Sequence, residues 1–580
     1  MGQQLFNRNQ VPLKGLYTSM VSDAIEPVNT PWCQNVRFRF GQVLKCPGRS
    51  VALSDRSPRY IMDFAQYTDA GGVKSVLSLE ASSLTDNSAC LYDPNAISFG
   101  TPVGLQNAQL DRRFSWAAGE ERLLVVRASP LNAIYRNPGT GVFTNEAVAS
   151  PAALFVEYFK NHTVLMNIIG NSNRIQWSAL AQYNDWATTT GHGGFLDLYD
   201  GTVEEITNGK ILADRLVVYR KSSITDIVAT GDPENPFLPE GRVYGLGCLA
   251  PWTLVNLGQS HVFLANDFNV YTWDGVNLNP IGTPIHSYIR QLYDPSTMNS
   301  WITTPFAAAF VSYKEYWLVL SQLGSGQYVA LIYDYLRDTW TRDVFTNLYS
   351  IFEQSLPGAT TTAGYNGTGY PASYPVLMTG MNHDYLMIDE RIDGGRYTRP
   401  ADGGIDMFVD TPDMYYDEKA MQNATLERVM VSEGAPRSTG EPAFQLEVSI
   451  DRGNTFATSQ DVQPLDVHWG FEFSDLNITS NVRRYRFNYP KERGAAAPTL
   501  RAYTEVYVPS GEFFPVNRPI GTFLNYIPPT GVDTRKDGVI VGEDAVVPPT
   551  VRRHNPKDIR SIPRGDDEPD EPVLRVYQGR

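Results

Sequence analysis

The 580-residue sequence has few cysteines, few charged side chains and no long hydrophobic run. Its cysteines are far apart and show no paired ligand spacing, so they predict neither a disulfide framework nor a zinc site, and a reducing compartment fits them: Cys33, Cys46, Cys90 and Cys248. No apolar stretch approaches the roughly 18 residues of a membrane-spanning helix, and the first residues do not form a secretion signal. We therefore expect no membrane anchor and no export by that route.

Basic side chains are also scarce. Lys and Arg number 48 against 63 Asp and Glu, which gives a net charge of −15. Such a surface repels phosphates on average, which argues against a DNA-binding module. Charged residues make up only 19% of the chain and hydrophobic residues 42%, a balance that excludes wholesale disorder.

The chain is instead rich in aromatic residues and in residues that form turns. Aromatics reach 12%, with 32 Tyr, and 47 Gly and 39 Pro interrupt the sequence. This mixture favours short strands joined by tight turns, and no amphipathic helical stretch is long enough to dominate. We predict an all-β fold, and a chain of 580 residues predicts more than one module.

An aliphatic residue followed by an aromatic one and then by turn residues recurs along the chain. The aromatic positions are Tyr92, Tyr135, Trp177, Tyr219, Tyr271, Tyr333 and Tyr385. Their spacing of about 42 to 62 residues is close to that of a four-stranded propeller blade. A small sheet is hydrophobic on both faces, and a ring of such sheets buries each one against its neighbours. The pattern predicts a β-propeller of six to eight blades, with a pair of β-sandwiches as the alternative.

Changes in composition divide the chain into four parts. We expect an extended N-terminal arm over residues 1–55 with one strand near Asn35–Phe40, and the β-propeller over residues 56–395. Longer alternating strands predict an antiparallel, platform-like β module over residues 396–525. Residues 526–580 form an extended Pro-rich tail that has too few apolar side chains for a core of its own.

The tail is expected to lie against a partner protein. Its composition cannot repay the entropy of ordering the backbone by itself, so a neighbouring subunit must supply the contacts. The charged residues that we expect at this interface are Arg552, Arg553, Asp566, Asp567 and Glu568.

One motif is specific. Residues 449–456 match the Asp-box pattern at five spaced positions: Ser449, Asp451, Gly453, Thr455 and Phe456. The Asp and the Gly of such a box shape a tight hairpin turn, and the aromatic residue packs beneath it. The motif resembles the boxes of sialidases, but those enzymes carry one box per blade and this chain has one. We predict a structural hairpin.

The remaining motifs do not predict catalysis. Residues 245–250 formally match the dinucleotide fingerprint, but Pro251 and Trp252 follow where a helix should begin, so a strand and a turn are expected. The seven histidines are scattered and none has metal-ligand spacing. We predict no enzyme activity, no cofactor and no metal. A carbohydrate-binding or sialidase-like propeller is the alternative, and it would require arginines such as Arg112, Arg113, Arg215 and Arg242 to converge.

Three features together resemble the tail nozzle, tail-hub or packaged-DNA stabilisation proteins of short-tailed bacteriophages. The first is the segment Trp32–Gly41, an Asn-Val-Arg-aromatic strand, followed by a basic Pro-Gly turn at Lys45–Arg49 in which Cys46 departs from the family's basic residue. The second is the aromatic blade endings at residues 175–186 and 333–340, and the third is the Asp box beyond the propeller. The resemblance spans residues 30 to 510.

This resemblance implies a structural virion protein without catalytic activity. Six copies would form a ring, the nozzle or hub, below the connector, which retains packaged DNA and conducts it during ejection. The implied partners are further copies in a homohexamer, a connector or adaptor protein, and tail fibre, spike or needle proteins. DNA would pass without specific binding, and an acidic channel wall would favour such passage because like charges repel. The implied location is the virion tail, assembled in the host cytoplasm.

Overall fold

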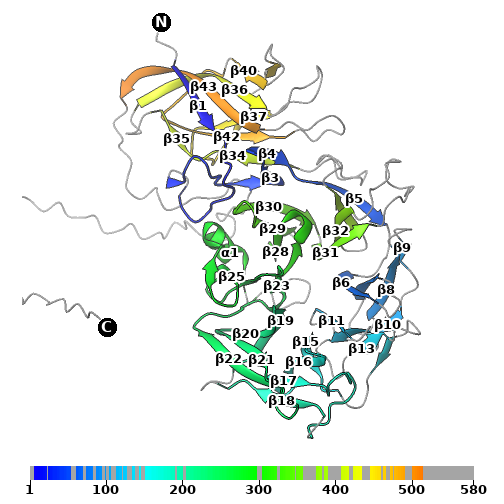
Figure 1. The fold of residues 1–580 in the computed structure, drawn as a ribbon. Coiled ribbons are helices and arrows are strands. Elements are labelled where there is room, and N and C mark those ends of the chain that lie inside the picture. The colour runs from blue at the N-terminus through cyan, green and yellow to red at the C-terminus, as the bar shows by residue number, and fades with distance from the viewer. Residues whose placement is uncertain are drawn as a thin grey trace, which may run out of the picture. The chain divides into compact units, whose positions relative to one another are not determined.

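The computed structural model describes most of residues 5–513, with gaps of which the longest are 357–373, 390–405 and 434–444. The chain divides into two units, Met1–Pro529 and Thr530–Arg580, and every described residue belongs to the first. The described part is almost entirely β-structure (Figure 1). Its one α-helix is α1 (His286–Leu292), and three short 3-10 helices accompany it: η2 (Pro251–Thr253), η3 (Thr283–Ile285) and η4 (Val311–Tyr313).

Seven antiparallel sheets follow one another along the described chain, numbered here sheet 1 to sheet 7. Sheet 1 contains β6 (Tyr60–Thr68), β7 (Lys74–Ala81), β8 (Asn87–Asp93), β9 (Ser98–Phe99) and β10 (Val103–Leu105). Sheet 2 contains β11 (Ser115–Gly119), β12 (Arg122–Val126), β13 (Ile134–Arg136) and β14 (Phe143–Asn145). Sheet 3 contains β15 (Ala153–Phe159), β16 (His162–Ile168), β17 (Asn171–Trp177) and β18 (Gly194–Asp197). Sheet 4 contains β19 (Ile206–Leu212), β20 (Arg215–Arg220), β21 (Ser223–Ala229) and β22 (Phe237–Tyr244).

The other three sheets have four strands each. Sheet 5 contains β23 (Val255–Asn256), β24 (His261–Leu264), β25 (Val270–Trp273) and β26 (Leu278–Pro280). Sheet 6 contains β27 (Phe306–Phe310), β28 (Glu315–Ser321), β29 (Gln327–Asp334) and β30 (Thr339–Thr346). Sheet 7 contains β31 (Leu348–Leu356), β32 (Tyr374–Met381), β33 (Tyr385–Asp389) and, from the N-terminal segment, β5 (Gly48–Leu53).

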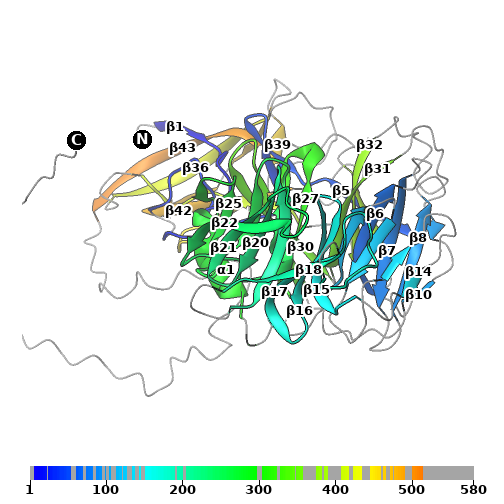
Figure 2. The same cartoon turned by 60° about the horizontal axis from the view of Figure 1, so that its bottom comes forward.

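The seven sheets form a closed ring, which confirms the predicted β-propeller. The first strand of each sheet contacts the first strand of the next, and β31 of sheet 7 contacts β6 of sheet 1 (Figure 1). Figure 2 shows the strands of neighbouring sheets face to face around this ring. Hydrophobic clusters fill the spaces between sheets, as between Phe155, Trp177 and Phe237 of sheets 3 and 4. Each small sheet thereby buries both faces.

Most of the recurring aromatic residues occupy the same strand position in their sheets. Tyr92, Tyr135, Trp177, Tyr271, Tyr333 and Tyr385 lie in the third strands of their sheets. Tyr219 lies in the second strand of sheet 4, which accounts for part of the uneven spacing. The longest interval, between Tyr271 and Tyr333, contains α1 and two of the short 3-10 helices.

The N-terminal segment contains five described strands where the sequence suggested one. β5 pairs antiparallel with β33, from Gly48 opposite Asp389 to Leu53 opposite Tyr385. A strand from the start of the chain therefore completes the last sheet and covers an edge that would otherwise offer unpaired backbone groups.

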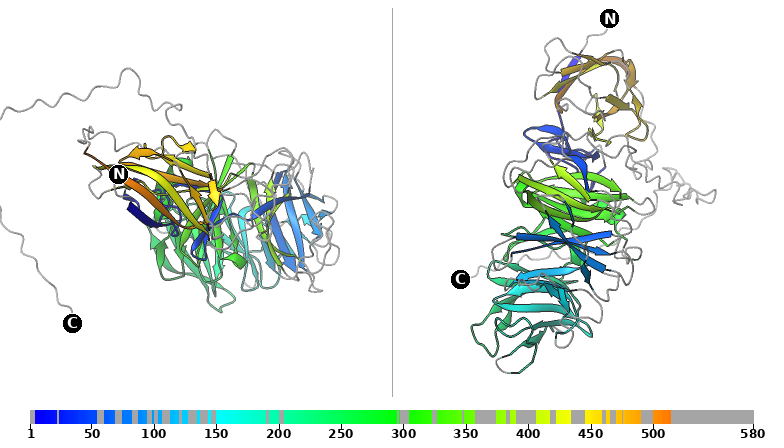
Figure 3. Two further views of the ribbon diagram at one scale, coloured as in Figure 1. Left: turned by 90° about the horizontal axis from the view of Figure 1, so that it is seen from above. Right: turned by 90° about the vertical axis from the view of Figure 1, so that its right-hand side faces the viewer.

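The other N-terminal strands join two sheets of the C-terminal module. One sheet contains β1 (Leu5–Gln10), β3 (Val36–Arg39), β4 (Gln42–Lys45), β36 (Gln422–Glu433), β39 (Val462–Pro464), β40 (Gly470–Phe473), β41 (Ile478–Ser480) and β43 (Leu500–Phe513). The other contains β2 (Cys33–Gln34), β34 (Phe408–Asp410), β35 (Met414–Tyr415), β37 (Gln445–Ser449), β38 (Ala457–Thr458) and β42 (Val482–Asn488). In Figure 3 the blue N-terminal strand lies beside the yellow and orange strands of this module, in line with the pairing of β1 with β43.

Candidate functional site

The segment Trp32–Gly41, the first feature of the family resemblance, joins the propeller to the C-terminal module. Asn35 separates β2 from β3 with a positive φ of 54°. Its side-chain amide donates to the carbonyl of Asp406 at 2.7 Å, and its side-chain oxygen accepts from the backbone N–H of Val344 at 3.0 Å. Its own N–H donates to the carbonyl of Arg342 at 2.8 Å. One side chain thus connects the module with β30 of sheet 6.

Two arginines of β3 enter a buried cluster of carboxylates from sheet 6. The Arg37 guanidinium donates to both carboxylate oxygens of Asp343, at 2.8 and 2.9 Å, and its Nε lies 3.3 Å from Glu315. Arg39 donates to the same Glu315 at 2.6 Å. The side chains of Arg37, Asp343 and Glu315 are at most 4% exposed. A guanidinium matched to a carboxylate by two parallel hydrogen bonds is a strong and directional pair.

An arginine of sheet 6 also contacts the N-terminal segment. Arg342 donates from Nη1 to Gln34 at 2.8 Å and from Nε to the hydroxyl of Tyr288 at 3.0 Å. Its guanidinium lies 4.6 Å above the ring of Trp32, which meets Tyr288 edge to face at 5.0 Å. We call this set of contacts the junction: it consists of Gln34, Arg37, Arg39 and their partners in sheet 6.

Arginines of β42 form a second set of buried pairs inside the C-terminal module. Arg483 pairs with Glu505, Arg484 lies 2.9 Å from Asp413, and Arg486 donates to Asp410 at 2.7 and 2.9 Å. Each pair connects β42 with a neighbouring segment. A buried charge that lost its partner would be costly, so these pairs fix which segments lie together.

The predicted Asp-box residues lie together in the turn between β37 and β38. Ser449 accepts from the N–H of Gly453 at 2.7 Å, and Asp451 accepts from the N–H of Thr455 at 2.8 Å and from its hydroxyl at 2.6 Å. Burial alone would raise the pKa of Asp451, but the hydrogen bonds from Thr455 and Ser449 outweigh it and lower that pKa. The ring of Phe456 lies 4.0 Å from the guanidinium of Arg486. The box therefore anchors its hairpin to a buried ion pair.

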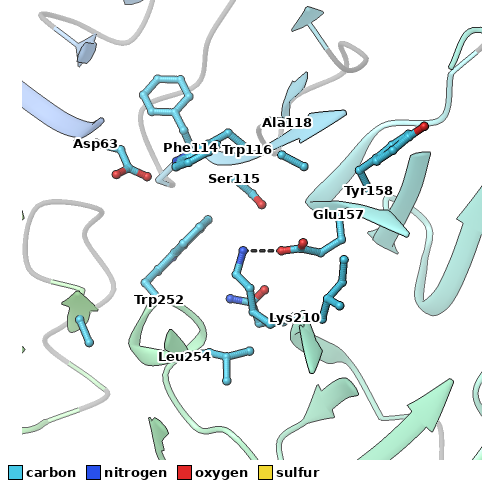
Figure 4. A pocket seen from close by; sticks show the side chains of 14 residues that line it. Asp63, Phe114, Ser115, Trp116, Ala118, Glu157, Tyr158, Lys210, Trp252 and Leu254 are labelled. Atoms are coloured by element: carbon cyan, nitrogen blue, oxygen red, sulfur yellow. Dashed lines mark hydrogen bonds and ion pairs between the residues drawn. The ribbon is translucent and has the colours of Figure 1, made fainter. Parts of the chain in front are cut away.

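A cavity of about 360 Å³ lies among the first strands of the propeller (Figure 4). Its lining comes from sheets 1 to 4, from sheet 6 and from η2. Lys210 of β19 and Glu157 of β15 form an ion pair in it, and their side chains are 29% and 12% exposed. Burial raises the pKa of Glu157, while the Lys210 ammonium opposes that rise. Burial also raises the pKa of Asp63 on β6 to about 6, although Arg113 lowers it.

The arginines considered for a sialidase-like site do not converge where their side chains are described. Arg113 is buried at the closure of the ring, where it donates to the carbonyls of Met62 and Tyr349. Arg215 lies on β20 and pairs with Asp226 and Glu240 at 3.3 Å. The side chains of Arg112 and Arg242 lie outside the described residues.

Several other sequence expectations can be located. Residues 245–250 follow the end of β22 and lead into η2, so the formal fingerprint lies between a strand and a short 3-10 helix. The cysteines whose side chains are described are buried and form no disulfide: Cys33, Cys46 and Cys248. Within the described ranges no group of acidic, His or Cys side chains could hold a metal, and no helix there is long and apolar enough to span a membrane. The predicted interface residues of the tail lie outside the described residues: Arg552, Arg553, Asp566, Asp567 and Glu568.

The sequence alone did not identify Glu315 and Asp343, the acidic residues of the junction, nor did it identify the cavity. Glu315 is a carboxylate at the start of the apolar strand Glu315–Ser321, which is a usable signal because a buried strand rarely carries an unpaired charge. The cavity has no such local signal, since its residues come from separate sheets.

No family model and no curated protein sequence matches the chain. Among solved structures, the WD40 domain of Pan2 from Neurospora crassa matches over 59% of this chain and 93% of that one, with 9% identity and a TM-score of 0.33. The extracellular domain of a hybrid two-component system from B. thetaiotaomicron matches over 71% of this chain and 44% of that one, with 8% identity and a TM-score of 0.27. The propeller is therefore assigned from this chain's own strand pairing.

Breaking the main ion pair of the junction should destabilise the protein strongly. Arg37→Ala or Asp343→Ala leaves a buried charge without its partner, so we expect a loss of about 3–5 kcal/mol in the free energy of unfolding. The measurement is chemical denaturation. Arg174→Ala is the control, because the Arg174–Asp197 pair is partly exposed and should contribute about 0–1 kcal/mol. The double variant Arg37→Met/Asp343→Leu should recover most of the loss, and equal costs for single and double variants would contradict this account.

The glycine of the Asp box should not tolerate a side chain. Gly453 has a φ of 84°, and an added Cβ would collide with the guanidinium of Arg484. Gly231 has a similar φ of 80° with open space around it, so Gly231→Ala carries only the backbone cost of about 1–2 kcal/mol. We expect Gly453→Ala to lower the thermal midpoint further than Gly231→Ala does. Equal shifts in the two variants would show that the contact with Arg484 does not matter.

The raised pKa of Asp63 predicts a pH dependence of stability. Because its pKa is about 6 in the folded protein against a usual 3.8, the folded state binds the proton more tightly, so stability falls as the pH rises from 3.8 to about 6 and stays at the lower value above that. Asp63→Asn removes this effect. The variant should therefore gain stability relative to the wild type at the higher pH. Its free energy of unfolding minus that of the wild type should be larger at pH 7.5 than at pH 4.5 by about 1–3 kcal/mol.

Asp197→Asn provides a control whose relative stability should not change between these two pH values. The hydrogen bond from Arg174 lowers the pKa of Asp197 below its usual 3.8, so its contribution to stability is present at both pH 4.5 and pH 7.5 and is lost only as the pH falls further, through that lowered pKa. A relative stability of Asp63→Asn that did not change between the two pH values would contradict the assignment of a buried, proton-retaining carboxyl group.

Proposed function

We propose that this chain is a structural subunit of a bacteriophage tail, which forms a nozzle or hub ring below the connector, retains packaged DNA and conducts it during ejection. The observation that supports this best is the junction. The segment that resembles the tail family, Trp32–Gly41, is the one whose arginines are buried against Glu315 and Asp343. These charges are paired with each other, so they serve to hold two modules in a fixed relation and not to bind a substrate.

A subunit of a ring requires a fixed position of its modules relative to one another. Each copy in a homohexamer must present the same surfaces to its neighbours, and modules that moved relative to one another would allow rings of many geometries. In this proposal the ring also contacts a connector or adaptor protein and tail fibres, spikes or needles. In this proposal the protein resides in the virion tail after assembly in the host cytoplasm and catalyses no reaction.

The net charge of −15 supports passage of DNA without specific binding. A wall that carries the same sign of charge as the phosphates keeps the DNA from adhering to it. Among the described contacts, several arginines are buried in ion pairs and are not available to a phosphate, as Arg37, Arg483 and Arg486 are. Each pair also buries one carboxylate, so the net charge of −15 stays with the rest of the chain.

The test is the assembly state of the purified protein. Mass photometry and electron-microscopic class averages should show rings with sixfold symmetry, alone or after addition of the connector and adaptor proteins. The variant that lacks residues 531–580 should keep the thermal midpoint of the full chain but form fewer rings, because the tail is proposed to contact a neighbour. Arg174→Ala serves as an assembly control, since its pair is local to sheet 3.

Single-copy particles under every condition would overturn the ring. Assembly of the truncated chain as efficient as that of the full chain would overturn the role of the tail. Release of sugar from a polysaccharide, abolished by one carboxylate substitution, would favour the sialidase-like alternative instead.

A further inference from the structure

The propeller cavity combines flat aromatic surfaces with charged groups that compensate one another. Trp116 of β11 and Trp252 of η2 line it, and the ring of Trp252 packs against the ring of Phe155 with the two centroids 5.2 Å apart. In Figure 4 the side chains of Trp252, Lys210 and Glu157 project toward the same space. Indole faces in a cavity are suited to stack against the C–H face of a ligand ring.

The polar groups of the cavity are held in place by the strands that carry them. Asn208 and Lys210 are two residues apart on β19, so they share one face of that strand. The Asn208 amide donates to the carbonyl of Pro251 at 2.7 Å, and its oxygen accepts from the N–H of Gly209 at 2.8 Å, which fixes its orientation. Asp63 accepts from the N–H of Phe64 at 2.8 Å. These side chains need little reorganisation to receive a ligand.

The balance of charges selects the class of ligand. Two carboxylates, Asp63 and Glu157, face one ammonium, Lys210, while the buried guanidinium of Arg113 attracts Asp63. An anionic ligand would meet both carboxylates, and an organic cation would meet Lys210. A hydroxyl group both donates and accepts, so it can bond to a carboxylate and to an ammonium at once.

We propose that this cavity binds a neutral saccharide of one or two rings. Its volume of about 360 Å³ lies at the lower end of the range for small-molecule sites, which limits the size of the ligand. Lys210, at 29% exposed, shows that solvent reaches the cavity. This site is independent of the proposed tail role, because it lies within one propeller and uses no residue of the junction.

The experiment uses the full chain and defined neutral sugars. Methyl glycosides of glucose, galactose and N-acetylglucosamine, together with cellobiose and lactose, are added at up to about 10 mM, a range suited to weak binding. Saturation-transfer NMR detects contact with sugar C–H protons, and intrinsic tryptophan fluorescence reports on Trp116 and Trp252. We expect at least one sugar to give both signals.

Two isosteric variants test the site. Asp63→Asn and Glu157→Gln each remove a charged acceptor, so each should weaken binding about tenfold, the effect of losing one charge-assisted hydrogen bond. Asp63→Asn is expected to be at least as stable as the wild type at pH 7.5, which keeps the test valid if Glu157→Gln fails to fold. Phe195→Ala and Asp197→Asn are the controls, because both residues lie on β18, outside the cavity, and should leave the affinity unchanged.

Three outcomes would overturn the proposal. The first is the absence of any signal from every neutral sugar at the highest concentration. The second is binding that persists unchanged in Asp63→Asn, or that Phe195→Ala abolishes. The third is saturable binding of inorganic phosphate or of tetramethylammonium at this cavity with none of a sugar, which would assign a charged ligand. Sixfold rings without sugar binding would leave the tail proposal standing and reject this one.

Discussion

The buried ion pairs of Arg37 and Arg39 with Asp343 and Glu315 are the constraint on which the arrangement of the described modules depends. Removing these charges from water is costly, and the cost is repaid only when β3 lies against sheet 6 with both hydrogen bonds of the Arg37–Asp343 pair formed. The pairs therefore discriminate against any other position of the N-terminal segment. A purely apolar interface would pack as well, but it lacks directional contacts and would restrict the relative position of the modules less.

The position of β3 also determines how the ring closes. Only a few residues separate β4 from β5, so a chain held at the junction delivers Gly48–Leu53 to the open edge of β33. At the other end of the same segment, β1 pairs with β43 of the C-terminal module. One short segment thus completes a propeller sheet and a module sheet. Pairing of strands so distant in sequence carries a large loop-closure entropy, which favours formation after the separate sheets exist.

Charged residues have opposite uses in the two best-defined sites. At the junction, and along β42, every named carboxylate has an arginine partner and is almost fully buried, so these charges specify packing. In the cavity the Lys210–Glu157 pair is partly exposed, and Asp63 keeps a raised pKa of about 6. Burial without a full partner is what raises that pKa, and such incompletely satisfied groups are common where a protein binds a ligand.

The sequence by itself determined the features that depend on local patterns. Alternating apolar residues and turn residues predict strands, and the aromatic recurrence predicts the propeller because six of its seven positions lie in the third strands of the described sheets. The Asp box was equally predictable, since Ser449, Asp451 and Thr455 satisfy one another within a single turn. Only the tertiary structure decided the rest. The partners of Arg37 lie about 300 residues away, β5 pairs with a strand at the far end of the propeller, and the cavity is assembled from several sheets, so no local spacing in the sequence encodes them.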